Sequence, residues 1–106
     1  MNIVCVAACT AGIAHTYIAR EKLIKGAKAL GHNIKVETQG TIGTENELLM
    51  ADISAADVVI LAVDVKIKGE ERFFNKRIVR VKTEIVIKSP IQFLEKVEKS
   101  LVTTNQ

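Results

Sequence analysis

The chain has 106 residues, of which 48% are hydrophobic, and this is enough for one domain with one core. We expect a single domain over residues 1–106, with a frayed tail at about residues 103–106. A net charge of +3 with interspersed acids and bases, and an aromatic content of only 4%, argue against nucleic-acid binding. No apolar run approaches the roughly 20 residues of a membrane span, so direct membrane insertion is not expected.

Four segments have the patterns of β-strands. Residues 3–8 (IVCVAA) and 58–63 (VVILAV) are continuously apolar, which is typical of parallel strands buried on both faces. Residues 33–38 and 77–81 alternate polar and apolar side chains, which predicts strands at the two edges of the sheet.

A helical pattern follows the first strand. Ala19, Leu23, Ala27 and Leu30 recur at i, i+4, i+8 and i+11, which predicts one core-facing side of a helix. Gly31 stands where a helix terminator is expected.

The segment after the second strand, QGTIGTENEL, contains two glycines and is expected to begin as a loop. We then expect a short helix from Thr44 or Glu45, with Thr44 as its cap and Glu47 three residues later. Another helical turn or two is expected over residues 52–57.

The last third of the chain holds a connection and a final helix. Residues 66–75 are charged and are expected to be irregular or briefly helical, and for residues 82–90 we favour a helical turn over a strand. Pro90 suits the first turn of a helix that runs to about Leu101, with Ser89 as its cap. Its expected core-facing side chains are Phe93, Leu94, Val97 and Leu101.

This order of elements predicts an α/β fold with a small four-stranded parallel sheet. The expected strand order is 2-1-3-4, with helices on both faces in a Rossmann-like, three-layer arrangement. Ligands of such sheets bind beyond the carboxyl ends of the strands, where the order reverses between the first and third strands. Cys9 follows the first strand and Asp64 follows the third, so both lie at the predicted site.

The two cysteines have different contexts. Cys5 lies inside the first strand, about 13 Å from Cys9 along an extended chain, which is beyond disulfide reach, so we interpret it as a core residue. The same separation excludes a zinc site built from Cys5, Cys9, His15 and His32, and no metal is expected. His32 follows the helix terminator and is interpreted as a surface residue. The first residues lack a secretory leader, so we expect a reducing, cytosolic location.

Cys9 stands where a strand becomes a helix. Unpaired N–H groups and the positive end of a helix dipole favour a thiolate at such a point, and they would also cradle a phosphate. Gly12 lets the backbone approach an anion closely. The spacing leaves two interpretations open, which are a nucleophile in an anion-binding loop or a packed cysteine beside an ordinary glycine turn.

His15 and Thr16 favour a phosphoryl carrier over a phosphatase. Counting from Cys9, His15 stands where a thiol phosphatase of the C-x5-R type has the arginine that clamps the phosphoryl oxygens. His15 either donates a hydrogen bond to a phosphoryl group or faces solvent. Thr16 either donates its hydroxyl to that group or bonds back to the helix backbone.

The stretch CTAGIAHTY, followed by GHNIKVETQGTIGTENEL, resembles the enzyme IIB component (fructose family) of the bacterial phosphoenolpyruvate-dependent sugar phosphotransferase system. The likeness continues through AADVVILAVD, ERFFNKRI and the Ser89-Pro90 region, so it covers nearly the whole chain. The resemblance implies a phosphotransferase that needs no cofactor. In it, Cys9 accepts a phosphoryl group from a phosphohistidine of the IIA component and passes it to a fructose-like sugar held by the membrane component IIC.

The resemblance also implies where the phosphoryl group is held. The family loop usually reads C-P-T-G-x-A-H-T, and the C-T-A-G of this chain looks more like the cellobiose and lactose family. Backbone donors do not depend on side chains, so the expected phosphate-binding residues are Thr10, Ala11, Gly12, Ile13, Ala14, His15 and Thr16.

Three further residues are candidates for the border of the site. Gln39 and Gly40 match the family's ETQG and would border the site or contact a partner, unless they only form a tight turn. Asp64 matches an acidic position and is either at the border or a cap for the segment that follows.

Two other functions are kept as alternatives. A cysteine-dependent phosphatase would turn over an aryl phosphate, and a regulatory module on the same scaffold would bind a partner without being phosphorylated. The partners expected from the resemblance are IIA, IIC and the sugar of IIC. The expected location is the cytoplasm, at the inner face of the membrane through IIC.

Overall fold

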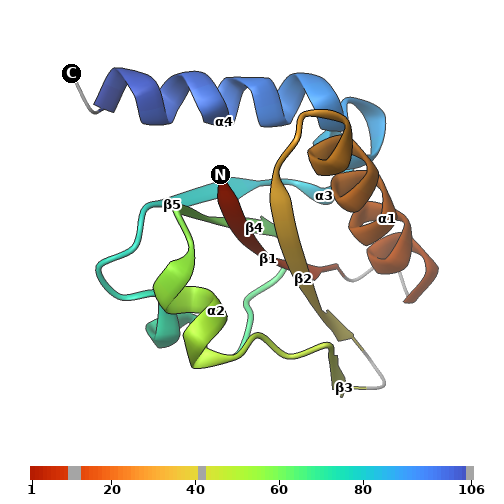
Figure 1. The fold of residues 1–106 in the computed structure, drawn as a ribbon. Coiled ribbons are helices and arrows are strands. Elements are labelled where there is room, and N and C mark those ends of the chain that lie inside the picture. Colours follow the sequence, from red (N-terminus) through yellow and green to blue (C-terminus); the bar gives the residue numbers. More distant parts are fainter. Residues whose placement is uncertain (10–12, 41–42, 105–106) are drawn as a thin grey trace.

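The computed structural model describes residues 1–9, 13–40 and 43–104. Its elements, shown in Figure 1, are in chain order β1 (Asn2–Ala8), α1 (Ile13–Ala29), β2 (Asn33–Gly40), β3 (Gly43–Glu45), α2 (Met50–Ala55), β4 (Val58–Val63), the 3-10 turn η1 (Glu70–Phe73), β5 (Ile78–Val81), α3 (Thr83–Lys88) and α4 (Pro90–Thr104).

The strands form one mixed sheet in the order β3-β2-β1-β4-β5. β1 pairs in parallel with β2 on one side and with β4 on the other, and β5 joins β4 in parallel. The predicted α/β fold is confirmed, and the four parallel strands lie in the predicted relative order. The prediction of a four-stranded, purely parallel sheet is wrong, because β3 adds a fifth strand that is antiparallel to β2.

β3 occupies the segment for which we expected the start of a helix. Thr44 pairs with Gln39 in the β2–β3 ladder, so it does not cap a helix, and Gly40 pairs with Gly43. Gly43 has a φ of 107°, which glycine adopts without strain. Hydrogen bonding to the open edge of β2 satisfies backbone groups that an isolated helical turn would leave unpaired, and it therefore outweighs the capping pattern.

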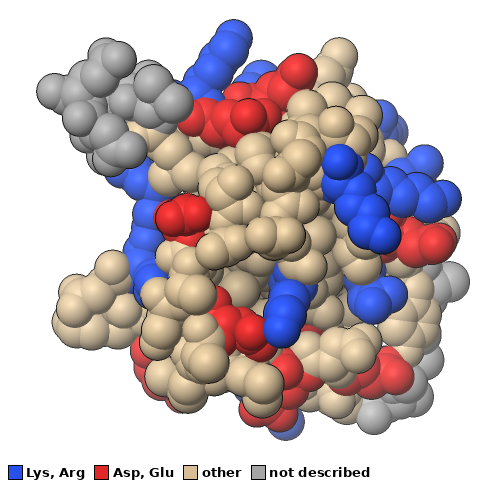
Figure 2. All heavy atoms as spheres, viewed as in Figure 1, with Lys and Arg blue, Asp and Glu red and all other residues tan. Residues whose placement is uncertain are grey.

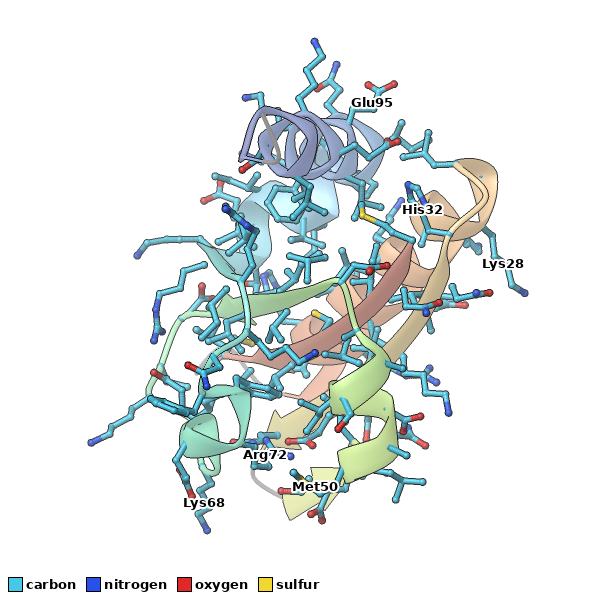
Figure 3. The ribbon with its side chains drawn as sticks, turned by 60° about the vertical axis from the view of Figure 1, so that its left-hand side comes forward. Lys28, His32, Met50, Lys68, Arg72 and Glu95 are labelled. Carbon is cyan, nitrogen blue, oxygen red and sulfur yellow. The ribbon has the colours of Figure 1, made fainter. Side chains whose placement is uncertain are left out.

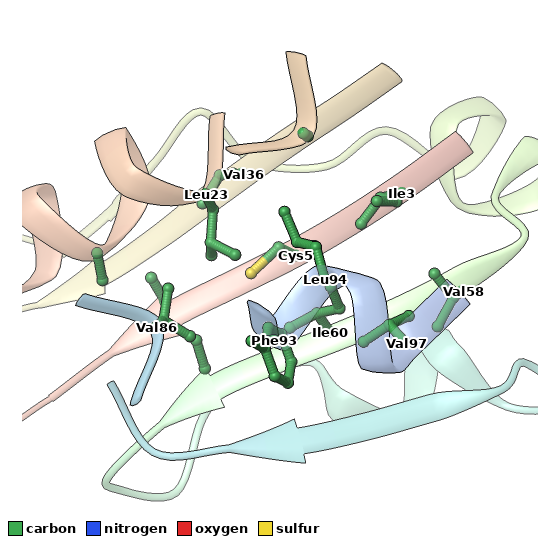
Figure 4. Close-up of a cluster of buried hydrophobic side chains, with 14 residues drawn as sticks. Ile3, Cys5, Leu23, Val36, Val58, Ile60, Val86, Phe93, Leu94 and Val97 are labelled. Carbon is green, nitrogen blue, oxygen red and sulfur yellow. The ribbon is translucent and has the colours of Figure 1, made fainter. Parts of the chain in front are cut away.

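Helices cover both faces of the sheet (Figure 1). α1, α3 and α4 pack on one face, and α2 and η1 pack on the other. Figure 4 shows the Cys5 side chain inside the hydrophobic cluster between the sheet and the helices α1, α3 and α4. It lies among the side chains of Leu23, Ile60 and Leu94. Cys5 is completely buried, and this burial raises the pKa of its thiol to about 12, although a backbone hydrogen bond with Ala62 opposes the rise. The prediction that Cys5 is a core residue is confirmed.

The predicted face and end of α1 are also confirmed. Ala19, Leu23 and Ala27 are each 0% exposed. Gly31 follows the helix with a φ of 79°, and the N–H of His32 donates to the carbonyl oxygen of Ala27 at 2.8 Å.

The interpretation of His32 as a surface residue is wrong, because its side chain is only 10% exposed. Its Nδ1 lies 3.0 Å from the amino group of Met1, and its Nε2 lies 3.4 Å from a carboxylate oxygen of Glu98. The start of β1 and the helix α4 therefore enclose a side chain that local sequence places in a turn.

The last two helices follow the predictions closely. α3 is the favoured helical turn, and α4 begins at Pro90 and buries Phe93, Leu94 and Val97. The carbonyl oxygen of Ser89 accepts the N–H of Phe93 at 3.0 Å. α4 continues to Thr104, three residues beyond the expected end at Leu101.

The surface carries both signs of charge. Figure 2 shows acidic and basic side chains interspersed on the face in view, with no single sign dominating it. Within the parts of the chain that the structure describes, no helix is both long enough and apolar enough to cross a membrane.

Candidate phosphoryl-transfer site

Cys9 lies directly after the central strand of the sheet. Ala8 is in register with Gln39 of β2 and with Val63 of β4, and its carbonyl oxygen accepts the N–H of Asp64 at 2.9 Å. The carboxyl ends of these three strands meet at this point, which is where ligands of open α/β sheets bind. The half-buried Cys9 is therefore at the predicted position in the fold.

Thr16, in the first turn of α1, contacts the sulfur of Cys9. Its Oγ1 lies 3.3 Å from the Cys9 Sγ, and Thr16 is only 3% exposed. The Thr16 hydroxyl thus faces the thiol across the strand-to-helix turn, and its donation to a phosphoryl group stays a prediction. Tyr17, on the same turn, donates a hydrogen bond to Glu45 of β3.

The predicted phosphate loop is described only in part. Thr10, Ala11 and Gly12 lie outside the described residues, and α1 begins at Ile13 and continues through Ala14. The first amides of a helix have no partner within it, so the start of α1 offers N–H donors next to Cys9.

His15 and Asp64 come together beside this turn. They line a pocket of about 460 Å³ whose wall is formed by His15, Asp64, Lys82, Thr83, Glu84, Ile87 and Lys88. His15 is half-buried. The pocket lies between the start of α1 and the start of α3. The two predicted residues, His15 and Asp64, therefore lie on the same side of the site.

Asp64 connects the end of β4 to α3. Its Oδ1 accepts the backbone N–H of Thr83 at 3.1 Å, and its Oδ2 accepts the Thr83 hydroxyl at 2.5 Å. Desolvation opposes ionisation of Asp64, but these hydrogen bonds and the positive charge of Lys82 hold its pKa below the usual range. The carboxylate therefore holds the first residue of α3, which is 19 residues further along the chain, and not the segment that directly follows Asp64.

Gln39 lies on the other face of the sheet from the Cys9 side chain. It is in register with Ala8, which belongs to the cluster under α2 and η1, whereas Cys9 contacts Thr16 of α1. The Gln39 amide is hydrogen-bonded within the chain to Lys68 and Glu37. Gly40 is exposed and, as the last residue of β2, pairs with Gly43 of β3.

The sequence analysis did not predict the buried ion pair between Glu37 of β2 and Arg72 of η1. Glu37 is 1% exposed, and both of its carboxylate oxygens accept hydrogen bonds from Arg72, at 2.8 and 3.1 Å. Burial opposes ionisation of Glu37, but hydrogen bonds from Arg72, Gln39 and the N–H of Leu48 keep its pKa low. The carboxylate in turn raises the pKa of the Arg72 guanidinium.

A signal for this pair was present but ambiguous. Glu37 fits a polar position of an alternating edge strand, as the exposed Asn33 and Lys35 do, and only its contact with Arg72 of η1 shows that Glu37 is buried. Among residues 1–9, 13–40 and 43–104, no three His, Cys, Asp or Glu side chains are grouped closely enough to hold a metal ion.

Comparisons with known proteins identify the family. A family model described as "PTS system, Lactose/Cellobiose specific IIB subunit" matches residues 4–96. The chain is 50% identical over 103 residues to the "PTS system fructose-like EIIB component 2" of Escherichia coli (strain K12), and the match covers 97% of each chain. It is 42% identical over 108 residues to the "Fructose-like PTS system EIIBC component" of the same strain, covering 100% of this chain and 22% of that protein.

The fold matches solved structures as well. The crystal structure of a domain from the fructose-specific IIABC component of Borrelia burgdorferi is 48% identical, with a TM-score of 0.84 and coverage of 89% of each chain. These matches agree with the resemblance of the loop and with the strand-to-helix turn that brings Cys9 to Thr16. The chain therefore belongs to the IIB components of the bacterial sugar phosphotransferase system, as the sequence predicted.

Proposed function

We propose that this chain is a phosphocysteine carrier in which Cys9 is the nucleophile. As a IIB component, it is a phosphotransferase of a sugar-uptake system. The observation that carries the proposal is the position of the Cys9 sulfur, which lies after the central strand and 3.3 Å from the Thr16 hydroxyl oxygen. Helix amides and a hydroxyl donor at one point favour binding of an anionic phosphoryl group.

The transfer has two balanced steps. In the first, the Cys9 thiolate attacks the phosphorus of a phosphohistidine, the S–P bond forms, and the N–P electron pair returns to the donor imidazole. In the second, a sugar hydroxyl attacks the same phosphorus, the O–P bond forms, the S–P bond breaks with its electron pair staying on sulfur, and the hydroxyl proton passes to a base of the IIC component. Alignment and charge stabilisation supply most of the catalysis in such transfers.

We assign the phosphoryl group to the loop that joins β1 to α1. The backbone of residues 10–16 would hold its oxygens, Thr16 would donate its hydroxyl, and His15 and Asp64 would lie at the rim. This assignment is supported by the start of α1 at Ile13 and by the shared pocket of His15 and Asp64.

The partners follow from the direction of transfer. The relative named as an EIIBC component supports IIC as the acceptor-side partner, and a IIA phosphohistidine is the donor. We infer that the chain works at the cytoplasmic face of the membrane, where it meets IIC. The names of its relatives favour a fructose-like sugar.

A phosphorylation experiment tests the proposal. The protein is mixed with a phosphorylated fructose-type IIA protein, and its intact mass is measured. We expect one added phosphoryl group that maps to Cys9, none on Cys9→Ser, and a normal reaction for Cys5→Ala. Continuous turnover of an aryl phosphate would favour the phosphatase, and binding of IIA without phosphorylation would favour the regulatory module.

A further inference from the structure

A segment of the chain crosses the carboxyl end of β1 next to Cys9. Residues 64–68, named here the crossing segment, start at the end of β4 and reach Gln39 of β2. β1 lies between these two strands, and its Ala8 is in register with both of them. The crossing segment therefore passes over the last residue before Cys9.

Gln39 fixes the far end of the crossing segment with two hydrogen bonds. Its Oε1 accepts the backbone N–H of Lys68 at 2.9 Å, and its Nε2 donates to the Lys68 carbonyl oxygen at 2.9 Å. A single amide side chain thus satisfies both backbone polar groups of Lys68, as a neighbouring strand would.

The buried ion pair holds Gln39 in this orientation. Gln39 Nε2 also donates to Oε2 of Glu37 at 2.8 Å, and Glu37 is held by both arms of Arg72. Nε of Arg72 donates to the carbonyl oxygen of Gly69 at 2.6 Å, so the same guanidinium also holds the residue after the crossing segment. Figure 3 shows Arg72 near Lys68, on the side of the molecule away from α4, which carries Glu95. A buried ion pair adds little net stability compared with apolar packing, and in some proteins it specifies one arrangement of its neighbours.

The rest of the crossing segment is also held. Asp64 is hydrogen-bonded to Thr83 at one end, and Ile67 is buried in the cluster that contains Ala8. Val65 packs against the same cluster. The end of β1 is thus enclosed by α1 on the face that Thr16 occupies and by the crossing segment on the opposite face.

We propose that Gln39, oriented by the Glu37–Arg72 pair, is a positioning residue for phosphoryl transfer. It holds the crossing segment against Ala8 and so keeps the Cys9 backbone in the position needed for in-line attack on phosphorus. This inference rests on the proposed function of Cys9. Because small misplacements slow an aligned transfer, loosening the segment lowers kcat, while the KM for the donor protein is unchanged.

Replacing Gln39 by methionine tests this inference, because methionine has a similar length and lacks the amide. With phosphorylated fructose-type IIA as donor, the single-turnover rate at saturation is expected to fall about tenfold in Gln39→Met, with KM within about twofold of the wild type. Gln92→Met is the matched control, since Gln92 is exposed on α4, and it is expected to leave both constants unchanged. Hydrogen exchange of the Lys68 amide is expected to be faster in Gln39→Met.

Several outcomes would overturn the inference. A wild-type transfer rate despite faster exchange at Lys68 would show that the crossing segment does not align Cys9. A raised KM with unchanged kcat would mean that Gln39 serves docking of the donor instead. If Gln39→Met does not fold, Gln39→Asn keeps an amide but shortens the side chain so that it no longer reaches Lys68, and the same fall in kcat is expected. Absence of any phosphoryl group on the wild-type protein is a separate result, which overturns the proposed function itself.

Discussion

The hydroxyl oxygen of Thr16 lies 3.3 Å from the sulfur of Cys9, although the two residues are seven apart in the chain. The end of a parallel strand and the first turn of the next helix bring them together, with Thr16 almost completely buried. A buried hydroxyl in this position can donate to a thiolate and then to an oxygen of the phosphoryl group.

Thr16→Val is therefore expected to slow phosphorylation of Cys9. Valine has nearly the same shape, so the fold is retained while one hydrogen bond is lost, which is worth about 1 kcal/mol or about fivefold in rate. The rate is measured by rapid quench with phosphorylated IIA. Thr16→Ser keeps the hydroxyl and should retain most of the wild-type rate. Equal rates for the valine variant and the wild type would show that the Thr16 hydroxyl takes no part in the transfer.

The two cysteines are expected to differ sharply in reactivity. Cys5 is completely buried with a pKa of about 12, so it has almost no thiolate at neutral pH, whereas Cys9 is half-buried. Iodoacetamide at pH 8 should add one label to the native protein, at Cys9, and two labels in denaturant. Mass spectrometry of the digested protein measures this, and equal labelling of both thiols in the native state would contradict the structure.

The Glu37–Arg72 pair is expected to make stability depend on pH. The folded-state pKa of Glu37 is below its ordinary value of 4.5, so its contribution is fully present above that pH and is lost as the pH falls through the folded-state pKa. Glu37→Gln removes one member of a buried pair and should lower the free energy of unfolding by about 3 kcal/mol at pH 7.

Urea unfolding at several pH values checks this prediction. The difference in stability between the wild type and Glu37→Gln should shrink as the pH drops from 5 towards 3. A difference that stays constant over that range would show that Glu37 does not act through its charge.

Gly69 is expected to tolerate alanine less well than Gly31 does. Both have a left-handed φ, of 77° and 79°, so alanine costs about 1 kcal/mol at either position. A Cβ at Gly69 would also lie 2.6 Å from Nε of Arg72, whereas a Cβ at Gly31 would meet nothing within 4 Å.

Gly69→Ala should therefore shift Arg72 without breaking its pair with Glu37, and lower the free energy of unfolding by about 1 kcal/mol more than Gly31→Ala does. Chemical denaturation of the two variants side by side measures the difference. Equal losses would show that the arginine moves aside at no cost.

Most of the parallel sheet could be predicted from the sequence because its strands are marked by local patterns. Two continuous apolar runs predict the central strands, and the helical spacing of Ala19, Leu23 and Ala27 predicts the face that packs on them. The same patterns, with the rule on switch points, place Cys9 correctly.

β3 and the surroundings of Gln39 could not be predicted in this way. Thr44 and Glu47 have the spacing of a helix cap, but the open edge of β2 offers hydrogen bonds that the local pattern does not include. Gln39 was a candidate for the border of the site, and only the packed structure shows that its amide is hydrogen-bonded to Lys68 and Glu37.

The sequence by itself determined the fold class, the family and the position of Cys9 at the end of the central strand, because all three depend on local spacing and on a contiguous motif. Only the tertiary structure decided the fifth strand, the enclosure of His32 and the burial of Glu37 against Arg72. Each of these depends on residues far apart in the chain that meet only when helices and strands pack, and the free energy of that packing has no local signature.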